Sequence, residues 1–150
     1  MRTKILCLAV LVLSAAAMSQ VSRSDKKTVS SPEFPKPLGP YSHAVVAGGF
    51  VFVAGQGSIN PKTQKMELGD IKSETRLELT NISTFLKAAD SSIENVVKVS
   101  VFLADVNDFE AMNEVYREFF KDNYPARTTV QAVLRTGRKI EIDCIARANQ

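Results

Sequence analysis

The strongest constraint on the fold is a strict alternation of apolar and polar residues near the C-terminus. In the segment IEIDCIA, one face of an extended chain carries Ile140, Ile142, Cys144 and Ala146. The other face carries Glu141, Asp143 and Ile145. This alternation is typical of a strand with one face against a core. Residues 126–131 alternate in the same way and place Arg127, Thr129 and Gln131 on one face. A short turn that contains Thr-Gly separates the two segments, so we expect them to form a hairpin.

Before this hairpin, the spacing of the apolar residues alternates between that of strands and that of helices. The order of these segments predicts the fold class. The expected elements are strands at 41–47 and 50–54, a helix at 70–89 capped by Asp70, a strand at 95–105 and a helix at 107–120. With the hairpin, the order is ββαβαββ. Each helix has one apolar face, so both helices can cover one face of a mixed sheet in an α+β two-layer sandwich. The second face of that sheet stays uncovered in a monomer, and an oligomer would cover it.

The N-terminal segment has the composition of a secretory signal peptide. Two basic residues precede an apolar run that is too short to span a bilayer as a helix, and small residues follow the run. We therefore expect residues 1–19 to be removed on export to the periplasm or the cell exterior, which leaves no membrane segment. Residues 20–36 are polar and rich in proline, and we interpret them as an arm with one short strand near Thr28–Ser30. We expect residues 37–150 to form the folded domain.

The charge balance argues against nucleic acid as a partner. The chain has 19 Lys and Arg residues and 16 Asp and Glu residues. Removal of residues 1–19 takes away Arg2 and Lys4, which leaves 17 basic and 16 acidic residues and a net charge of +1. A nucleic-acid-binding surface normally needs a clear basic excess.

The inventory of reactive side chains excludes several kinds of site. The chain has one histidine, His43, and Cys144 is the one cysteine after residue 19, so these residues cannot build a zinc site. The glycines of GGFVFVAGQG do not have the spacing that binds a dinucleotide between a strand and a helix. No G-x-S-x-G turn presents a serine to His43. We therefore expect neither a metal nor a cofactor.

Arg127 and Glu141 are the candidate functional residues of the hairpin. A guanidinium can bind a carboxylate with two parallel hydrogen bonds, although each residue taken alone is equally consistent with a solvated strand face. If the hairpin tip is a three-residue loop, the two side chains share a face and lie roughly 13 Å apart along the strands. A two-residue loop would put them on opposite faces. In both cases they could contact one small ligand only across a subunit boundary or through water.

Five segments of the chain occur in the order found in one protein family. They are GPYSHAV, FVFVAGQGSINPKT, VVKVSVFLADVNDFEAMNEVY, YPARTTVQ and KIEIDCIA. In these motifs the chain resembles the Rid (reactive intermediate deaminase) family, also called the YjgF family, from about Pro37 to Ala148. The resemblance implies a chorismate-mutase-like α+β fold that assembles as a homotrimer around a central barrel. It also implies ligand sites in the clefts between subunits.

The resemblance further implies an activity and a set of site residues. Family members hydrolyse 2-imino acids and their enamine tautomers to 2-keto acids and ammonia without metal or cofactor, so we expect a 2-iminobutanoate/2-iminopropanoate deaminase. In the matched motifs, Arg127 binds the substrate carboxylate and Glu141 positions or activates water. The residues that the resemblance places around the substrate are Tyr41, Gly55, Asn113 and Thr129. Thr129 stands where many members have cysteine, and Ala54 stands where serine is common.

Two other functions stay open from the sequence. One is a protein without catalytic activity that binds small 2-keto acids through Arg127. The other is an RNA-directed translation inhibitor or ribonuclease, an activity ascribed to some family members, although the near-neutral charge argues against it. An assay for imine hydrolysis separates the enzyme from the binding protein.

Overall fold

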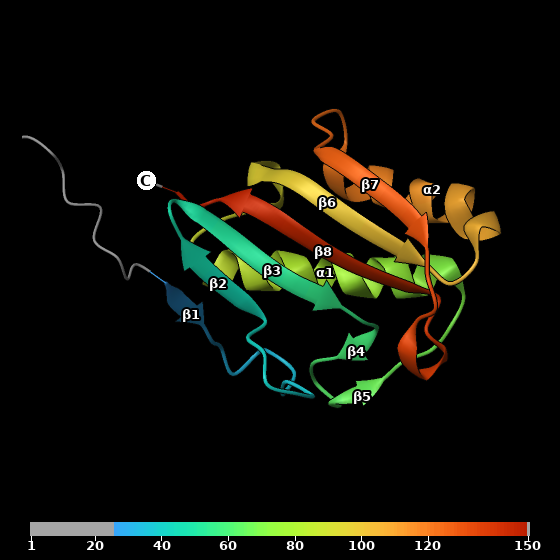
Figure 1. Cartoon of the computed structure of the whole chain (residues 1–150), viewed down its shortest axis with the longest axis horizontal. Coiled ribbons are helices and arrows are strands. Elements are labelled where there is room, and N and C mark those ends of the chain that lie inside the picture. Colours follow the sequence, from blue (N-terminus) through green and yellow to red (C-terminus); the bar gives the residue numbers. More distant parts are fainter. Residues whose placement is uncertain (1–25, 150) are drawn as a thin grey trace, which may run out of the picture.

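A computed structural model describes residues 26–149 of the 150-residue chain (Figure 1). Its elements are β1 (Lys27–Val29), β2 (Ala44–Ala47), β3 (Phe50–Gln56), β4 (Ile59–Asn60), β5 (Lys65–Met66), α1 (Ile71–Ala88), β6 (Val96–Leu103), α2 (Phe109–Phe120), β7 (Ala126–Gln131) and β8 (Ile140–Arg147). The segment predicted to be a signal peptide, residues 1–19, lies outside the described residues, as do residues 20–25 of the predicted arm.

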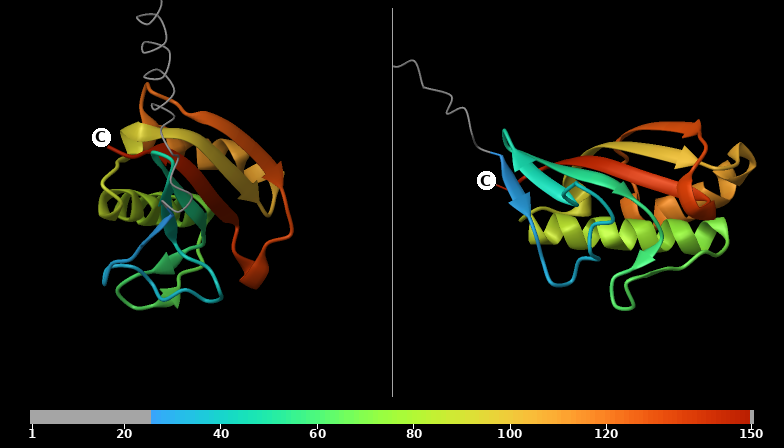
Figure 2. Two further views of the ribbon diagram at one scale, coloured as in Figure 1. Left: turned by 60° about the vertical axis from the view of Figure 1, so that its left-hand side comes forward. Right: turned by 60° about the horizontal axis from the view of Figure 1, so that its bottom comes forward.

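The described residues form an α+β two-layer sandwich. Six strands make one sheet in the order β1-β2-β3-β8-β6-β7, and β4 and β5 pair in a separate small ribbon. Both helices cover the same face of the large sheet (Figures 1 and 2). The sheet is mixed, because β6 and β7 run parallel while its other neighbouring strands run antiparallel. The predicted fold class is confirmed, and the trimer stays a prediction.

The helices form where the apolar residues follow a helical period. Asp70 caps α1, because its carboxylate accepts a hydrogen bond from the backbone N–H of Ser73 at 2.7 Å. The apolar side chains that α1 buries are Ile71, Leu79, Ile82, Phe85 and Leu86. Those that α2 buries are Met112, Val115, Tyr116 and Phe120. The sheet meets them with buried residues that include Val99, Val101, Leu103, Ile140, Ile142 and Cys144. The alternation predicted for residues 140–146 is therefore the one that buries the core.

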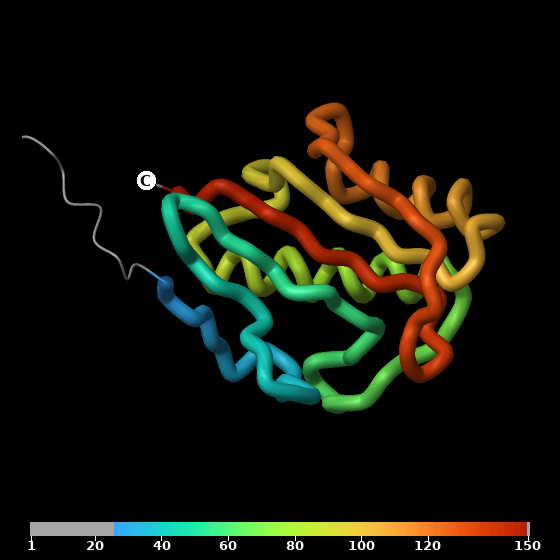
Figure 3. Tube along the Cα trace, viewed as in Figure 1, coloured from blue at the N-terminus to red at the C-terminus, as the bar shows by residue number. Residues whose placement is uncertain are grey.

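The predicted hairpin between residues 126–131 and 140–146 is wrong. Both segments are strands, but β6 lies between them and pairs with each. The connection at residues 132–139 passes the end of β6, where the N–H of Ala132 donates to the carbonyl of Leu103 at 2.8 Å. Figure 3 shows the path of this loop from the end of β7 to the start of β8.

The physical reason for this pairing is α2. The helix carries the chain back from the end of β6, so that β7 becomes a parallel neighbour of β6. The other edge of β6 is then free for β8. A connection of eight residues at 132–139 is also longer than the loop of a tight hairpin. The strand–helix–strand order was thus a signal in the sequence for a parallel pair.

The face of the sheet away from the helices carries exposed apolar side chains. Phe50 and Phe52 of β3 are 40% and 44% exposed, and Val130 of β7 is 44% exposed. Each alternates along its strand with residues that face the helices. Such a patch is usually covered by another surface. None of the helices within residues 26–149 has the length and apolar character needed to span a membrane.

Candidate active site

Arg127 lies near the start of β7 and faces α2. It is opposite Val99 of β6, which is opposite Cys144 of β8, and residues directly opposite in a sheet share a face. Val99 and Cys144 are buried in the core. The guanidinium carbon of Arg127 lies 4.5 Å from the centre of the Tyr116 ring and 5.6 Å from that of Phe109. Contact with two aromatic rings restrains the orientation of the guanidinium.

Arg127 forms one wall of a hollow of about 300 Å³. The lining comes from α2, from the loop before β7 and from β7 itself, and consists of Asn113, Tyr116, Arg117, Tyr124, Pro125 and Arg127. None of the ion pairs among residues 26–149 includes Arg127. A half-buried guanidinium that has no acidic partner within its own chain is suited to bind an anion.

Three other polar side chains lie on the same side of the sheet. Asn113, predicted to line the pocket, is buried on α2 and lines the hollow. Thr129 follows Arg127 by two residues on the same face of β7. The hydroxyls of Thr129 and Tyr116 are buried and have no hydrogen-bond partner among the described residues. Burial raises the pKa of Tyr116 to about 12, although the nearby Arg127 cation acts in the opposite direction. Tyr116 therefore keeps its proton at neutral pH and can donate it in a hydrogen bond.

Glu141 lies on β8 and points away from the helices. It is opposite Phe102 of β6, on the face of the sheet that the helices leave open. Its carboxylate accepts a hydrogen bond from Nη1 of Arg138 at 2.7 Å. A Cβ atom at position 55 would lie 2.5 Å from Oε1 of Glu141, so Gly55 gives the carboxylate the space to lie against β3. The structure thus brings Gly55 and Glu141 together, as expected for one site.

The predicted site residues form two groups on opposite faces of the sheet. The helix-side group is Arg127, Asn113 and Thr129, and the open-face group is Gly55 and Glu141. Of the two arrangements left open by the sequence, the opposite-face arrangement is the one observed, through a different strand pairing. Among residues 26–149, no group of three or more His, Cys, Asp and Glu side chains could hold a metal ion.

Tyr41 belongs to neither group. It precedes β2, is 42% exposed, and packs edge-on against His43 with the ring centres 5.4 Å apart. It lines a second hollow, of about 530 Å³, which is formed largely by the N-terminal arm. His43 itself holds the arm, since its Nε2 is hydrogen-bonded to the carbonyl of Pro35 at 2.8 Å and its ring stacks on Phe85.

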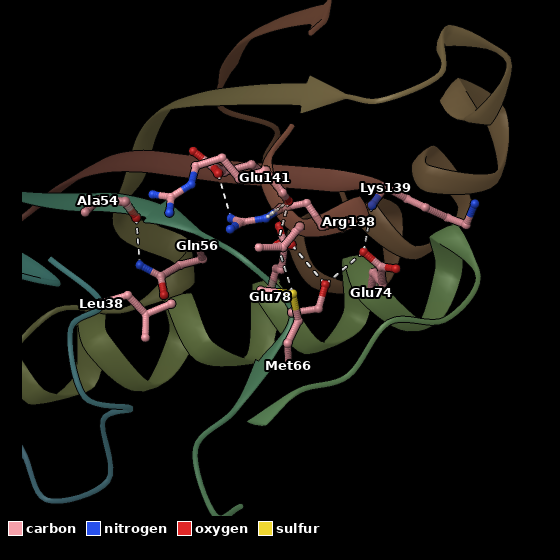
Figure 4. A network of polar contacts seen from close by, with 12 residues as sticks. Leu38, Ala54, Gln56, Met66, Glu74, Glu78, Arg138, Lys139 and Glu141 are labelled. Carbon is pink, nitrogen blue, oxygen red and sulfur yellow. Dashed lines mark hydrogen bonds and ion pairs between the residues drawn. The ribbon is translucent and has the colours of Figure 1, made fainter. Parts of the chain in front are cut away.

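Two buried glutamates of α1, Glu74 and Glu78, were missed from the sequence (Figure 4). They lie one turn apart and are only 1% and 0% exposed. Glu74 accepts hydrogen bonds from the hydroxyl of Ser58 and from the backbone N–H groups of Gly69 and Lys139, at 2.9, 3.0 and 2.9 Å. Glu78 accepts a bond from Ser58 at 3.4 Å, and its Oε2 has no partner among the described residues. Their spacing within the buried stripe of α1 was the signal that could have found them.

The environment of Glu78 favours its protonated form. Burial raises the pKa of Glu78 well above its ordinary value; the cation of Arg138 opposes this shift, and the carboxylates of Glu74 and Glu141 add to it. Because the folded protein holds this proton more tightly than the unfolded chain does, the contribution of Glu78 to stability is lost as the pH rises above 4.5 toward the folded value.

We expect Glu78→Gln to remove this loss. The variant is neutral at every pH, so it should gain stability over the wild type as the pH rises, by about 1–3 kcal/mol once Glu78 would be forced to ionise. Thermal unfolding of both proteins at pH values of about 5 and about 8 measures the difference. Glu110→Gln, at an exposed position on α2, is the matched control and should follow the wild type. A gap between Glu78→Gln and wild type that is the same at both pH values would contradict this assignment.

The comparison with known proteins identifies the family of the chain. The model described as Endoribonuclease L-PSP, which represents the Rid (YjgF) family, matches residues 31–148. The chain belongs to the Rid family. The resemblance seen in the sequence motifs is thereby confirmed over more than half of the chain.

Relatives and solved structures agree with this membership. The protein "mmf2, mitochondrial" of Schizosaccharomyces pombe is 47% identical over 112 residues, which cover 72% of this chain and 87% of that protein. The 2-iminobutanoate/2-iminopropanoate deaminase of Homo sapiens is 38% identical over 122 residues, which cover 81% of this chain and 89% of the human protein. The crystal structure of YyfA, a Rid family protein of unknown function from Yersinia pestis, has a TM-score of 0.79 and 34% identity, and the match covers 82% of this chain and 99% of that one.

The comparison corrects the expectation of export. The S. pombe relative is named as a mitochondrial protein. The family match begins at residue 31, so residues 1–19 lie outside both the match and the described residues. The interpretation of the chain as a secreted protein with a signal peptide is wrong by this comparison. A basic start followed by a short apolar run is a compositional pattern, and composition alone does not fix a compartment.

Proposed function

We propose that the protein hydrolyses 2-imino acids and their enamine tautomers to 2-keto acids and ammonia. The observation that carries this proposal is Arg127, a half-buried guanidinium that lies over Tyr116 and has no acidic partner among residues 26–149. Its planar fork matches a substrate carboxylate. A relative that is 38% identical is named 2-iminobutanoate/2-iminopropanoate deaminase, which supports the assignment.

The chemistry asks little of the protein beyond orientation. Arg127 binds the carboxylate, and Glu141 orients a water molecule and takes a proton from it as the oxygen attacks the imine carbon. A protonated imine is already electrophilic at that carbon, so addition of water gives a carbinolamine, which loses ammonia and leaves the 2-keto acid. On the Arg127 side, Tyr116 and Thr129 carry buried hydroxyls that have no hydrogen-bond partner among residues 26–149, and the Tyr116 side chain lines the hollow beside Arg127.

The two groups of site residues would meet across a subunit boundary. In the trimer that we propose, the open face of one chain packs against β7 and α2 of the next. Gly55 and Glu141 of one subunit then lie opposite Arg127 of its neighbour. The exposed apolar side chains of the open face, Phe50 and Phe52 among them, support such an assembly because a contact would bury them. Closed threefold symmetry makes the clefts equivalent.

We expect light scattering to give three times the 16.4 kDa mass of the chain at micromolar concentration. Phe52→Asp should lower both the mass and the rate of imine hydrolysis, because it places a charge in the middle of the open face. Phe52→Leu keeps that face apolar and serves as the control. A protein that is monomeric at these concentrations and hydrolyses imines at the full rate would contradict the proposed assembly.

The activity is tested with imino acids made in place by an amino-acid oxidase. Addition of the protein should speed the release of 2-keto acid and ammonia above the spontaneous rate. Calorimetry with 2-ketobutyrate measures binding in parallel. If the protein binds 2-ketobutyrate and accelerates no hydrolysis, it is a binding protein for 2-keto acids.

RNA cleavage is a second candidate because the matching family model is described as an endoribonuclease. With the correction on export, the formal net charge to consider is that of the whole chain, +3 at pH 7. This is still a small basic excess for a protein of 150 residues. Incubation with labelled single-stranded RNA tests this candidate directly. Cleavage by the wild type that Arg127→Ala and Glu141→Gln abolish would favour it.

A further inference from the structure

We propose that Arg138 is a positioning residue that holds the carboxylate of Glu141 for its action on water, an inference that rests on the proposed function. Arg138 lies in the loop at residues 132–139, which joins β7 to β8. It acts through Glu141 and does not contact the substrate. Its role thus differs from that of Arg127, which has no acidic partner among residues 26–149.

The contact between Arg138 and Glu141 is shielded from water. Nη1 of Arg138 donates to Oε2 of Glu141 at 2.7 Å, and the Arg138 side chain is 11% exposed. The side chains of the other two ion pairs within residues 26–149 are at least 46% exposed. A shielded, charge-assisted hydrogen bond orients its partners more strongly than an exposed pair does. Nε of Arg138 also donates to the carbonyl of Arg135 at 3.2 Å, which restrains the plane of the guanidinium.

Two glycines leave space for this pair. A Cβ atom at position 57 would lie 2.5 Å from Nη1 of Arg138, and one at position 55 would lie 2.5 Å from Oε1 of Glu141. Gly55 and Gly57 do not have positive φ angles, so the backbone does not demand glycine at either position. Space for the Arg138–Glu141 pair is therefore the structural reason for both glycines.

The buried glutamates of α1 support Arg138 from the opposite side. Glu74 accepts a hydrogen bond from the backbone N–H of Lys139 at 2.9 Å, which fixes the chain next to Arg138. Figure 4 shows Arg138 with Glu141 on one side and Glu74 and Glu78 of α1 on the other. The carboxyl of Glu78 lies close enough for the cation of Arg138 to act on its pKa. Glu141 is the carboxylate that contacts the guanidinium directly, and it is also the one that lies on the open face of the sheet.

The first test compares kinetic constants for imine hydrolysis. Arg138→Met keeps the side chain long and removes its charge, so kcat should fall roughly ten- to a hundredfold. KM should change little, because Arg127 still binds the substrate carboxylate. The control is Arg135→Met, which removes an exposed arginine from the same loop and should keep both constants. A rise in KM with unchanged kcat would show that Arg138 binds the substrate, and would overturn the inference.

A second variant displaces Arg138 without deleting it. Gly57→Ala puts a methyl carbon 2.5 Å from the present position of Nη1, which is too close, so the guanidinium must shift from its place beside Glu141. We expect the same loss of kcat as in Arg138→Met. Thermal unfolding shows whether each variant is folded. If Arg138→Met does not fold, Gly57→Ala still tests the inference.

The deciding measurement is a double-mutant cycle between Arg138→Met and Glu141→Gln. If Arg138 acts through Glu141, Arg138→Met should lower kcat far less in the Glu141→Gln background than in the wild type. Losses that multiply in the double mutant would overturn the inference. A wild type that hydrolyses no imine would instead refute the proposed function itself. A wild type that is active, with Arg138→Met and Gly57→Ala equally active, would refute only the role of Arg138.

Discussion

Arg127→Ala should lower imine hydrolysis by roughly thirty- to several-thousandfold, the effect of removing one partner of a desolvated charge pair at about 2–5 kcal/mol. Arg127→Lys should lose most of the activity as well, because lysine keeps the charge but has no planar fork for a carboxylate. The measurement is kcat/KM with imino acids generated by an amino-acid oxidase. Calorimetry should show that 2-ketobutyrate binding falls in parallel.

Both Arg127 variants should stay folded and trimeric. The side chain of Arg127 lies over Tyr116 at the rim of a hollow, and it forms none of the ion pairs among residues 26–149. Arg135→Ala, at an exposed position, controls for the loss of one positive charge. Wild-type turnover by Arg127→Ala would show that the site has been assigned to the wrong residues.

Mixing two inactive variants should restore activity if the site lies between subunits. Arg127→Ala keeps the open-face group, and Glu141→Gln keeps the helix-side group. In a trimer assembled at random from equal amounts of the two, about a quarter of the clefts combine an intact Arg127 with an intact Glu141. The mixture should therefore regain up to about a quarter of the wild-type rate, from two proteins that are each nearly inactive.

The mixing experiment needs subunit exchange, so the two variants are unfolded and refolded together. The control refolds each variant alone and then combines the two without exchange, which should give no gain. If activity is not regained after mixed assembly although trimers are present, then Arg127 of one subunit and Glu141 of its neighbour do not form a common site. The two-group site would then be wrong even if each residue were essential.

The sequence pattern predicted which side of a strand or helix is buried, but it did not predict which strands pair. The alternation from Ile140 to Ala146 gave the correct buried face of β8, since each residue of a strand lies in one of two environments. The cap at Asp70 was also local and correct. The pairing of β7 with β6 was not predicted, because it depends on where α2 returns the chain. That is a contact between distant segments, which alternation does not report.

The candidate site shows the same division. The motifs pointed to six residues. The structure places Arg127 and Asn113 at one hollow with Thr129 on the same side of the sheet, and Gly55 and Glu141 together on the open face, but Tyr41 lies apart from both groups. The sequence did not predict that Arg127 and Glu141 lie on opposite faces of the sheet. Their relative position depends on β6, which lies between β7 and β8 and pairs with both. The part played by Arg138 was also hidden, since an arginine in a loop has no pattern of its own. Its significance comes from the space at Gly57 and the neighbouring carboxylates.

The separation of the two groups by the thickness of the sheet has an evolutionary consequence. In the proposed trimer, each chain supplies Arg127 to one cleft and Glu141 to another. A substitution of one of these residues therefore disables one cleft and leaves the other group of site residues on the same chain intact. After a gene duplication, one copy could lose Arg127 and the other Glu141, and a mixed ring would keep at least one working cleft. Loss of either gene would then abolish the activity, because each copy would supply only one of the two groups of site residues.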